Sequence, residues 1–345
     1  MSELSAILSL SPFVLFLIFL ALLFDFLNGM NDAANSIATV VSTRVLRPIQ
    51  AVGLAAFFIF VAAFGMPLLV ARTIGTGIID TRISTPVLVF CALLGAIIWT
   101  ATATHWGLPI SVSHALIGGL IGAGISAAGI GVIQAGLWKV VVFMIVSPIL
   151  GIVFGFFFMV AVLWIVRRKS QSKVDGWFRR LQLISASAFS FSHGTNDAQK
   201  TMGLIFYLLL GTGYFAATGV GMGHETVPIW VILSAHAAIA CGTLSGGWGV
   251  IKTLGQKVAK LRPVHGFAAE TSAAGTIIGC SLLGIPVSTT HTITGSIIGV
   301  GSTRGASAVR WGVTRNIVLA WILTIPLSAI IGFVFYFVIR LFHFV

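Results

Sequence analysis

Gly29-Met30-Asn31-Asp32-Ala33 and Gly194-Thr195-Asn196-Asp197-Ala198 are near copies of each other, and each places an acidic residue inside a long apolar segment. The 345-residue chain is 57% hydrophobic and only 8% charged. Its apolar segments repeatedly exceed the roughly 20 residues that cross a bilayer. These features predict an all-α polytopic membrane protein. Because a carboxylate near the bilayer centre costs roughly 2.5–3.5 kcal/mol, two matched Asp residues indicate that the protein handles an ion or a solute.

The charge distribution and the cysteines exclude several classes of protein. The net charge of +12 comes from Lys and Arg in short loops between apolar segments, as the positive-inside rule expects, so nucleic acid is not expected as a partner. The three cysteines lie in apolar stretches and support neither a disulfide framework nor a thiolate metal site. We expect contacts with membrane lipid and no cofactor.

Two further motifs recur in the same order and indicate an internal duplication. Arg72-Thr73-Ile74-Gly75 matches Lys252-Thr253-Leu254-Gly255, and the segment 107–114 (GLPISVSH) matches 284–291 (GIPVSTTH). The duplication predicts three regions, which are a first transmembrane repeat at 1–166, a basic cytoplasmic linker at 167–181 and a second transmembrane repeat at 182–345.

Each repeat is expected to contain five spans, some of them broken or half-helices. The predicted spans cover 12–42, 49–71, 85–104, 114–132, 135–166, 182–211, 226–249, 264–283, 291–303 and 314–339. Most Lys and Arg residues then lie on the side of the linker, and an odd number of spans makes the two repeats inverted. If the Ser/His segments were fully re-entrant and left four spans per repeat, this charge asymmetry would weaken. Inverted repeats with broken helices are typical of secondary transporters, which bind substrate near the membrane midplane.

The Asn-Asp segments are expected to bind the coupling cation. Oxygen-bearing side chains fall on one face of the first segment and on the face next to it, namely Asp25, Asn28, Asn31, Asp32 and Asn35. Gly29 permits a local helix break that would add backbone carbonyls to a hard-cation site. Asn196 and Asp197 repeat the pair, so Na⁺ is a candidate ligand at Asp32 and at Asp197. Asp25 has no acidic counterpart in the second copy, which leaves a purely structural role open for it.

Three further ionisable residues lie in or near the second copy. Lys200 follows Asp197 by three residues and fits an intrahelical ion pair, in either a binding or an architectural role. His193 lies one turn before Asp197 and fits a proton relay or a hydrogen-bonded packing residue. Glu270 lies in the middle of a predicted span and is a candidate for binding the coupling cation or proton.

The repeated Pro-Ser-His segments are expected to bind an oxyanion. Pro109 and Pro286 fit the first turn of a half-helix, where backbone N–H groups are unpaired. The hydroxyl groups placed at these positions belong to Ser111, Ser113, Ser288, Thr289 and Thr290. Two such N-termini facing each other would offer N–H donors and a positive dipole to an anion. His114 and His291 follow the hydroxyls and are expected to orient the bends.

These motifs together resemble the inorganic phosphate transporter family known as PiT, whose members are low-affinity phosphate:cation symporters. The resemblance covers essentially the whole chain. It implies import of inorganic phosphate by symport with Na⁺ or H⁺, two inverted repeats, a homodimer and a location in the plasma (inner) membrane. It also implies that the Asn-Asp motifs bind the coupling cations and that the half-helix hydroxyls bind phosphate.

Other functions fit the sequence less well. Sulfate or another tetrahedral oxyanion is the nearest alternative, although the intact Asn-Asp motifs favour phosphate. A channel would need a filter, and none is recognisable here. An intramembrane hydrolase would need a nucleophile and a base in distinct roles, whereas the duplicated motifs place similar groups symmetrically, so we expect no enzymatic activity. Asp and Glu serve Na⁺ and H⁺ equally, which leaves the coupling ion open.

Overall fold

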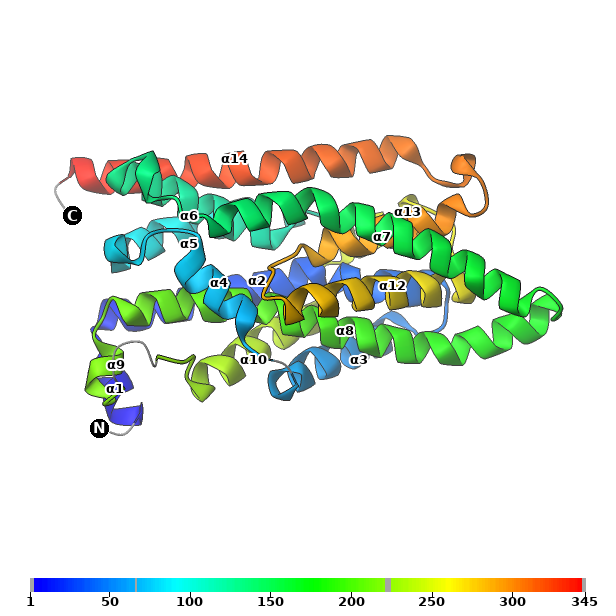
Figure 1. The fold of residues 1–345 in the computed structure, drawn as a ribbon, viewed down its shortest axis with the longest axis horizontal. Helices are drawn as coiled ribbons and strands as arrows, with labels where there is room; N and C mark the ends of the chain where they lie inside the picture. Colours follow the sequence, from blue (N-terminus) through cyan, green and yellow to red (C-terminus); the bar gives the residue numbers. More distant parts are fainter. Residues whose placement is uncertain (1–2, 66, 221–224, 343–345) are drawn as a thin grey trace.

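The computed structural model describes residues 3–65, 67–220 and 225–342, without the side chains of residues 3, 4, 256 and 257. The first two and last three residues of the predicted repeats therefore lie outside the described part. Every named element in the described part is helical, which confirms the predicted all-α fold. Most of the helices run along one long axis, with α1 (Glu3–Leu8) and the end of α14 (Trp311–Leu341) at one end (Figure 1).

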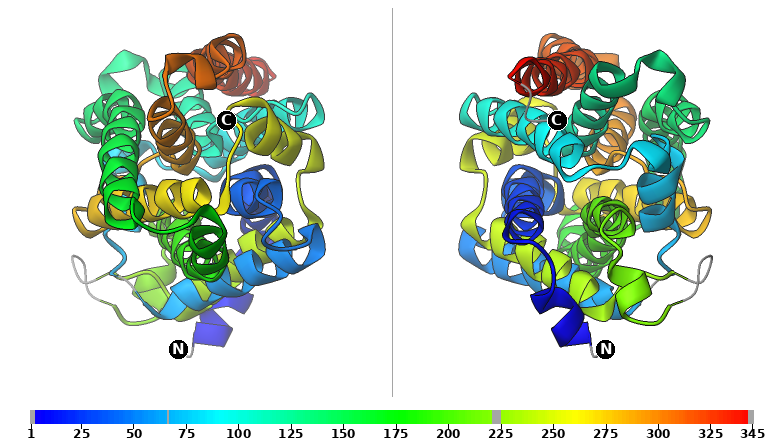
Figure 2. Two further views of the ribbon diagram at one scale, coloured as in Figure 1. Left: turned by 90° about the vertical axis from the view of Figure 1, so that its right-hand side faces the viewer. Right: turned by 90° about the vertical axis from the view of Figure 1, so that its left-hand side faces the viewer.

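The same order of helices occurs in both halves of the chain. The first half contains α2 (Pro12–Ser42), α3 (Pro48–Val61), α4 (Leu69–Gly77), α5 (Pro86–His105), α6 (Val112–Ala128) and α7 (Gly136–Val166). The second contains α8 (Gln171–Leu210), α10 (Ile229–Ser245), α11 (Trp248–Lys257), α12 (Pro263–Leu282), α13 (Thr289–Ser302) and α14. The short helix α9 (Tyr214–Ala217) follows α8. End-on views show these helices in a single bundle (Figure 2).

Within the described residues, four helices are long and apolar enough to cross a membrane, namely α2, α5, α7 and α14. Two bent pairs raise this number to six. The pair α10 and α11 bends by 75° where Gly246 adopts a positive φ of 67°. The helix α3 and its 3₁₀ extension Ala62–Phe64 bend by 80° against α4. The predicted spans 49–71 and 226–249 are therefore each broken into two arms, and the shorter arms, α4 and α11, diverge from the long helices.

The segments 85–104, 114–132, 264–283 and 291–303 do not form four separate crossings as predicted. With 17 and 14 residues, α6 and α13 span only about 25 and 21 Å, less than the roughly 30 Å of a bilayer core. A β-bridge between Ile79 and Ile133 joins the two ends of the α5–α6 pair, and one between Ala259 and Val309 joins the ends of α12–α13. Each pair is therefore a re-entrant hairpin, and the two hairpins enter from opposite ends of the bundle (Figure 1).

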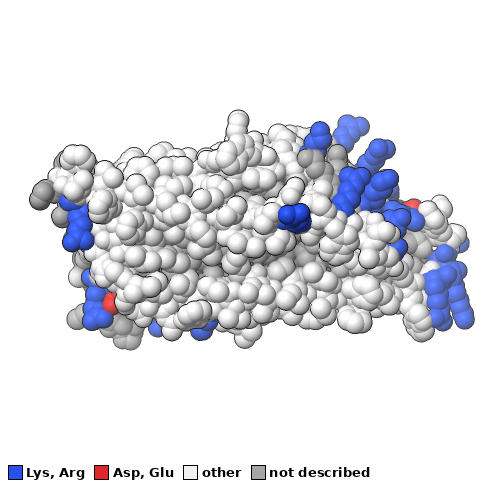
Figure 3. Space-filling view, turned by 90° about the horizontal axis from the view of Figure 1, so that it is seen from above, with Lys and Arg blue, Asp and Glu red and all other residues white. Residues whose placement is uncertain are grey.

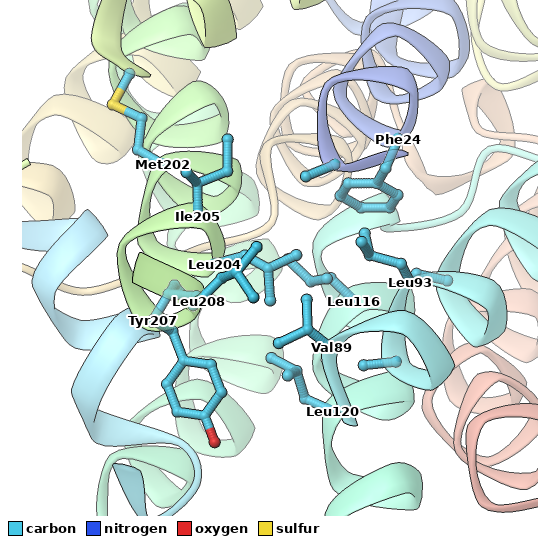
Figure 4. Close-up of a cluster of buried hydrophobic side chains, with 14 of the residues drawn as sticks. Phe24, Val89, Leu93, Leu116, Leu120, Met202, Leu204, Ile205, Tyr207 and Leu208 are labelled. Carbon is cyan, nitrogen blue, oxygen red and sulfur yellow. The ribbon is translucent and has the colours of Figure 1, made fainter. Parts of the chain in front are cut away.

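The helices that carry the Asn-Asp motifs are continuous, so the predicted break at Gly29 is wrong. Gly29 serves close packing instead, because a Cβ atom there would lie 2.0 Å from the carbonyl oxygen of Ile239 on α10. Around this contact, buried apolar side chains fill the bundle in two clusters, one of which contains Phe24, Leu93 and Leu204 (Figure 4).

The outer surface separates an apolar belt from a basic end. Large apolar side chains of α7 and α14 are exposed, among them Trp164 and Phe337, as lipid contact requires. Lys and Arg gather mainly at the end where α7 meets α8, which contains the predicted basic linker (Figures 1 and 3). This asymmetry is the one that the positive-inside rule expects of a membrane protein.

Candidate functional site

The two Asn-Asp motifs meet in the interior, where α2 and α8 bring their carboxylates to one histidine. His193 Nε2 lies 2.9 Å from Asp197 Oδ2 and 3.8 Å from Asp32 Oδ2. All three side chains are buried, and their ligand atoms lie within 4.8 Å of one another. Ser36 Oγ lies 3.2 Å from the other ring nitrogen of His193, which holds the ring between the carboxylates. Two carboxylate oxygens and one imidazole nitrogen therefore lie close enough together to bind a single ion.

Lys200 joins this centre to both hairpins. Its ammonium group forms a buried ion pair with Asp197. It also donates to Ser113 Oγ at 2.5 Å and to the carbonyl oxygen of Val287 at 2.8 Å. Ser113 lies in the first turn of α6, and Val287 lies just before α13, so one cation touches the two half-helix N-termini. The ion pair expected of an architectural lysine and the contacts expected of a binding lysine are therefore made by the same ammonium group of Lys200.

The hydroxyl groups of α13 contact the carboxylates directly. Thr289 Oγ1 lies 2.8 Å from Asp197 Oδ2 and 3.3 Å from Asp32 Oδ2, and its single proton can be donated to one of them at a time. Thr290 Oγ1 donates to Asp32 Oδ1 at 3.2 Å and accepts from Asn35 Nδ2 at 2.9 Å. The predicted cation ligands Asp32, Asn35 and Asp197 and the predicted anion ligands Thr289 and Thr290 thus lie in one cluster.

The two half-helix N-termini meet at this centre. Ser111 Oγ accepts the backbone N–H of His114 at 3.4 Å, and Ser288 Oγ accepts that of His291 at 3.2 Å. These two serines are therefore the N-caps of α6 and α13. The rings of His114 and His291 lie 4.8 Å apart in an edge-to-face contact, which places the two caps beside each other. The ring of His291 also stacks on Trp321, so the histidines pack the bend.

The asparagines of the two motifs make matched contacts away from the carboxylates. Asn31 donates to Thr104 on α5 at 2.7 Å, and Asn196 donates to Ser281 on α12 at 2.9 Å. Asn28 donates to Asp25 at 3.4 Å, one to two turns before Asp32. Several side-chain oxygens in these motifs are buried without a hydrogen-bond partner among the described residues, namely those of Asn28, Asn31, Asn35 and Asn196 and one oxygen of Asp25. Unpaired buried oxygens of this kind fit hard-cation ligands.

Glu270 lies apart from this centre in a polar cluster of its own. Its carboxylate accepts from Thr39 at 2.6 Å, from Gln182 at 2.9 Å and from Ser185. Gln182 in turn accepts from Thr43 at 2.9 Å. The residue is completely buried, and no Lys, Arg or His described in the structure lies within ion-pair distance of it. The sequence predicted a role for Glu270 but not its three donors, which come from α2 and α8.

The fold and this site define a class of protein. A buried cluster of carboxylates, a lysine and hydroxyls at the meeting point of two half-helix N-termini, inside a multi-pass helical bundle, is the arrangement of a membrane transport protein.

Comparison with known proteins agrees with this class and narrows it. Residues 28–332 match the model of the phosphate transporter family. The chain is 52% identical over 328 residues to a probable low-affinity inorganic phosphate transporter of Rhizobium meliloti, covering 94% of this chain and 96% of that one. It is 40% identical over 324 residues to a probable low-affinity inorganic phosphate transporter of Bacillus subtilis, covering 93% and 95% of the two chains.

A solved structure, that of a sodium-dependent phosphate transporter, matches with a TM-score of 0.84 at 27% identity and covers 96% of this chain and all of that one. The chain belongs to the phosphate transporter family. It is a multi-pass integral membrane protein of the plasma membrane and a transporter rather than an enzyme, as predicted. The sulfate alternative finds no support in these relatives.

Proposed function

We propose that this protein imports inorganic phosphate by symport with Na⁺, with phosphate bound between the N-termini of α6 and α13. The observation that carries this proposal is the direct contact of Thr289 with both Asp32 and Asp197 and of Thr290 with Asp32. Because the same hydroxyls face the carboxylates and begin a half-helix, cation and anion must bind side by side. The sodium-dependent relative favours Na⁺ over H⁺ as the coupling ion.

The charges of the site give the reason for coupling. Asp32 and Asp197 carry two negative charges and Lys200 carries one positive charge, so these three side chains have a formal charge of −1. A phosphate anion would be repelled from such a centre in a medium of low dielectric constant. Cations bound by the carboxylates and by the unpaired Asn oxygens remove this repulsion, and the helix N-termini and Lys200 then attract phosphate.

We assign a second coupling role to Glu270. Three neutral donors stabilise its buried charge without a positive partner, so a Na⁺ or a proton can neutralise it without breaking an existing ion pair. Thr39 lies on the same helix as Asp32, seven residues further on. Neutralisation of Glu270 would therefore act on α2, which also forms the central site.

The proposed cycle uses the two halves, 1–166 and 182–345, as inverted repeats on either side of a cytoplasmic linker at 167–181. The matched contacts Asn31–Thr104 and Asn196–Ser281 support this arrangement, since each anchors an Asn-Asp helix to the hairpin of its own half. Rocking of the halves about the site would expose it to one side at a time. A homodimer, implied by the family resemblance, belongs to the same proposal and can be tested by cross-linking in membranes.

The experiment that tests this proposal is uptake of labelled phosphate into liposomes that contain the purified protein. A Na⁺ gradient and a pH gradient are imposed separately, with excess sulfate as competitor. We expect uptake driven by the Na⁺ gradient and insensitive to sulfate. Uptake driven by the pH gradient alone would replace Na⁺ with H⁺, and strong inhibition by sulfate would overturn the assignment of phosphate as the substrate.

A further inference from the structure

We propose that Thr73 on α4 and Thr253 on α11 are positioning residues that act as the two gates of the transport path, an assignment that rests on the proposed alternating access. These residues belong to the matched motifs Arg72-Thr73-Ile74-Gly75 and Lys252-Thr253-Leu254-Gly255, which the central site does not use. Each threonine holds the turn of the hairpin in the other half of the chain.

The contact between each threonine and its hairpin turn is a hydrogen bond to a glycine carbonyl. Thr73 Oγ1 lies 2.8 Å from the carbonyl oxygen of Gly284, between α12 and α13. Thr253 Oγ1 lies 3.2 Å from that of Gly107, between α5 and α6. Each hydroxyl also lies near a carbonyl of its own helix, that of Leu69 at 3.2 Å for Thr73 and that of Gly249 at 3.1 Å for Thr253, so its single proton serves the turn or the helix at any one time. Both glycines have a positive φ, 67° and 66°, which other residues rarely adopt. The two bonds thus clamp equivalent turns.

The arms that carry the threonines also pack on the Asn-Asp helices of the opposite half. A Cβ atom at Gly75 of α4 would lie 2.9 Å from the carbonyl oxygen of Gly203 on α8. A Cβ atom at Gly255 of α11 would lie 2.7 Å from the carbonyl oxygen of Ala38 on α2. Each arm is therefore wedged between an Asn-Asp helix and a hairpin turn, and it cannot move without affecting both.

The clamped turns lead directly to the proposed ligands. Gly284 precedes Ser288 by four residues, and the carbonyl of Val287 between them binds Lys200. Gly107 precedes Ser111 by the same number of residues. Release of a turn would therefore displace the half-helix N-terminus that follows it. It would open the site toward the end of the bundle at which the arm holding that turn lies.

The gate at Thr73 borders an open cavity. A cavity of about 480 Å³ is lined by Thr73 and Gly284 together with Arg72 and Lys139. Both basic residues are exposed, and each would attract an anion to the surface above the turn. Gly136 and Lys139 at the start of α7 also line this cavity, and the basic linker lies beyond the other end of that helix (Figure 1). Thr73 is therefore assigned to the outer gate and Thr253 to the inner gate.

The two gates differ in strength. Gln199 on α8 accepts the backbone N–H groups of Val70 and Ala71 at 3.0 and 3.2 Å and donates to the carbonyl of Pro67 at 3.1 Å, which ties the start of α4 to the site helix. The residue equivalent to Gln199 in the first half is Ala34, and the N-cap residue of α11, Gly247, provides no side-chain cap in the described structure. Loss of the threonine hydroxyl should therefore loosen the inner gate more than the outer one.

Side-specific labelling of two buried reporters tests the assignment. Val287→Cys and Ile110→Cys are placed separately in a variant without native cysteines, because these equivalent positions are buried directly behind the two turns. A membrane-impermeant maleimide is then applied to each face of oriented vesicles. Thr73→Val should raise labelling at position 287 from the outer face about fivefold, the change expected for one lost hydrogen bond. Thr253→Val should raise labelling at position 110 from the inner face by more than that.

Matched controls separate a gate from general loosening. Thr76→Val lies on the same arm, but Thr76 bonds only to the carbonyl of Arg72 on its own helix, so both labelling rates should stay unchanged. Thr73→Ser keeps the hydroxyl and should restore the low rate. Equal acceleration at both reporters, or no acceleration from either Val variant, would overturn the proposal. Labelling needs neither phosphate nor Na⁺, so side-specific labelling without Na⁺-driven uptake would refute the proposed function and leave the gates standing.

Discussion

The cluster around Glu270 and the equivalent region around Leu93 are built on equivalent helices but from opposite kinds of side chain. Alignment of the motifs pairs Glu270 with Leu93, Gln182 with Leu17, Ser185 with Leu20 and Thr39 with Leu204. All four leucines are buried in one apolar cluster, in which Figure 4 shows Leu93 and Leu204. Around Glu270, three donors surround a carboxylate; around Leu93, leucines fill the corresponding positions.

This difference shows which polar residues the fold needs. The leucine set demonstrates that the helices pack with apolar side chains at these positions, and a buried ionised group rarely stabilises a fold more than such a set does. The Glu270 cluster therefore supports the coupling role proposed for it. It also makes the two halves unequal, because Leu93 occupies the position of Glu270 in the first half.

The largest loss of coupled uptake should come from substitutions at the central site, to which both halves contribute equivalent residues. Asp32→Asn and Asp197→Asn each remove a buried charge that is proposed to bind the cation, and coupled uptake should fall roughly 100-fold or more. Uptake of labelled phosphate into liposomes measures this loss, and size-exclusion profiles check that the variants fold. Near-normal coupled uptake by both variants would contradict the proposed role of the Asn-Asp motifs.

The difference between the two regions can be tested by placing a carboxylate in the apolar region around Leu93. Leu93→Glu buries a charge without donors, which should destabilise the protein by about 3–5 kcal/mol. Thermal unfolding in detergent measures this cost, with Leu93→Met as the matched control for altered packing. An unchanged unfolding temperature would mean that the leucine set tolerates a charge and that the two regions are not as different as their side chains indicate.

Removing the charge at Glu270 should affect coupling more than stability. Glu270→Gln keeps the size of the side chain and removes its negative charge, so Na⁺-driven uptake should fall about tenfold, as expected for lost charged hydrogen bonds. The unfolding temperature should stay within a few degrees of the unchanged protein. Full Na⁺-driven uptake by this variant would show that the cluster is structural and that coupling resides in the centre alone.

The smallest effect should come from the outer edge of the cluster. Thr43 donates to Gln182, which donates to Glu270, so Thr43→Val loosens the donor without touching the carboxylate. The loss of one neutral hydrogen bond predicts a reduction of about threefold to fivefold in apparent Na⁺ affinity. A titration of uptake against Na⁺ measures it. A reduction as large as that of Glu270→Gln would imply that Thr43 itself contacts the ion.

The sequence predicted those parts of the molecule that recur. The Asn-Asp pairs and the Pro-Ser-His segments were recognisable because each occurs twice, and the structure brings Asp32, Asp197, Thr289 and Thr290 together. The hairpins were mistaken for separate crossings because composition is the same for a helix that spans and for one that turns back halfway. The half-helices α6 and α13 were expected from Pro109 and Pro286, but their return beside α5 and α12 is shown only by the β-bridges that join the ends of each hairpin.

The partners of Glu270 could not be predicted from spacing. Thr39, Gln182 and Glu270 come from three different helices and are separated by 88 to 231 residues in the hydrogen bonds they form. An isolated Thr or Gln in an apolar helix usually satisfies local backbone, so the sequence offered no reason to select these ones. The links of Lys200 to both hairpins were hidden for the same reason, since Val287 contributes only its backbone carbonyl.

The central claim is that cations must neutralise the carboxylates before phosphate can bind. Equilibrium binding of labelled phosphate to the purified protein, measured in Na⁺ and in an equal concentration of choline, tests it most directly. The account predicts that Na⁺ tightens phosphate binding by at least about tenfold, as removal of repulsion in a buried site requires, and that Asp32→Asn makes binding insensitive to Na⁺. Equal affinity for phosphate in Na⁺ and in choline would contradict the account.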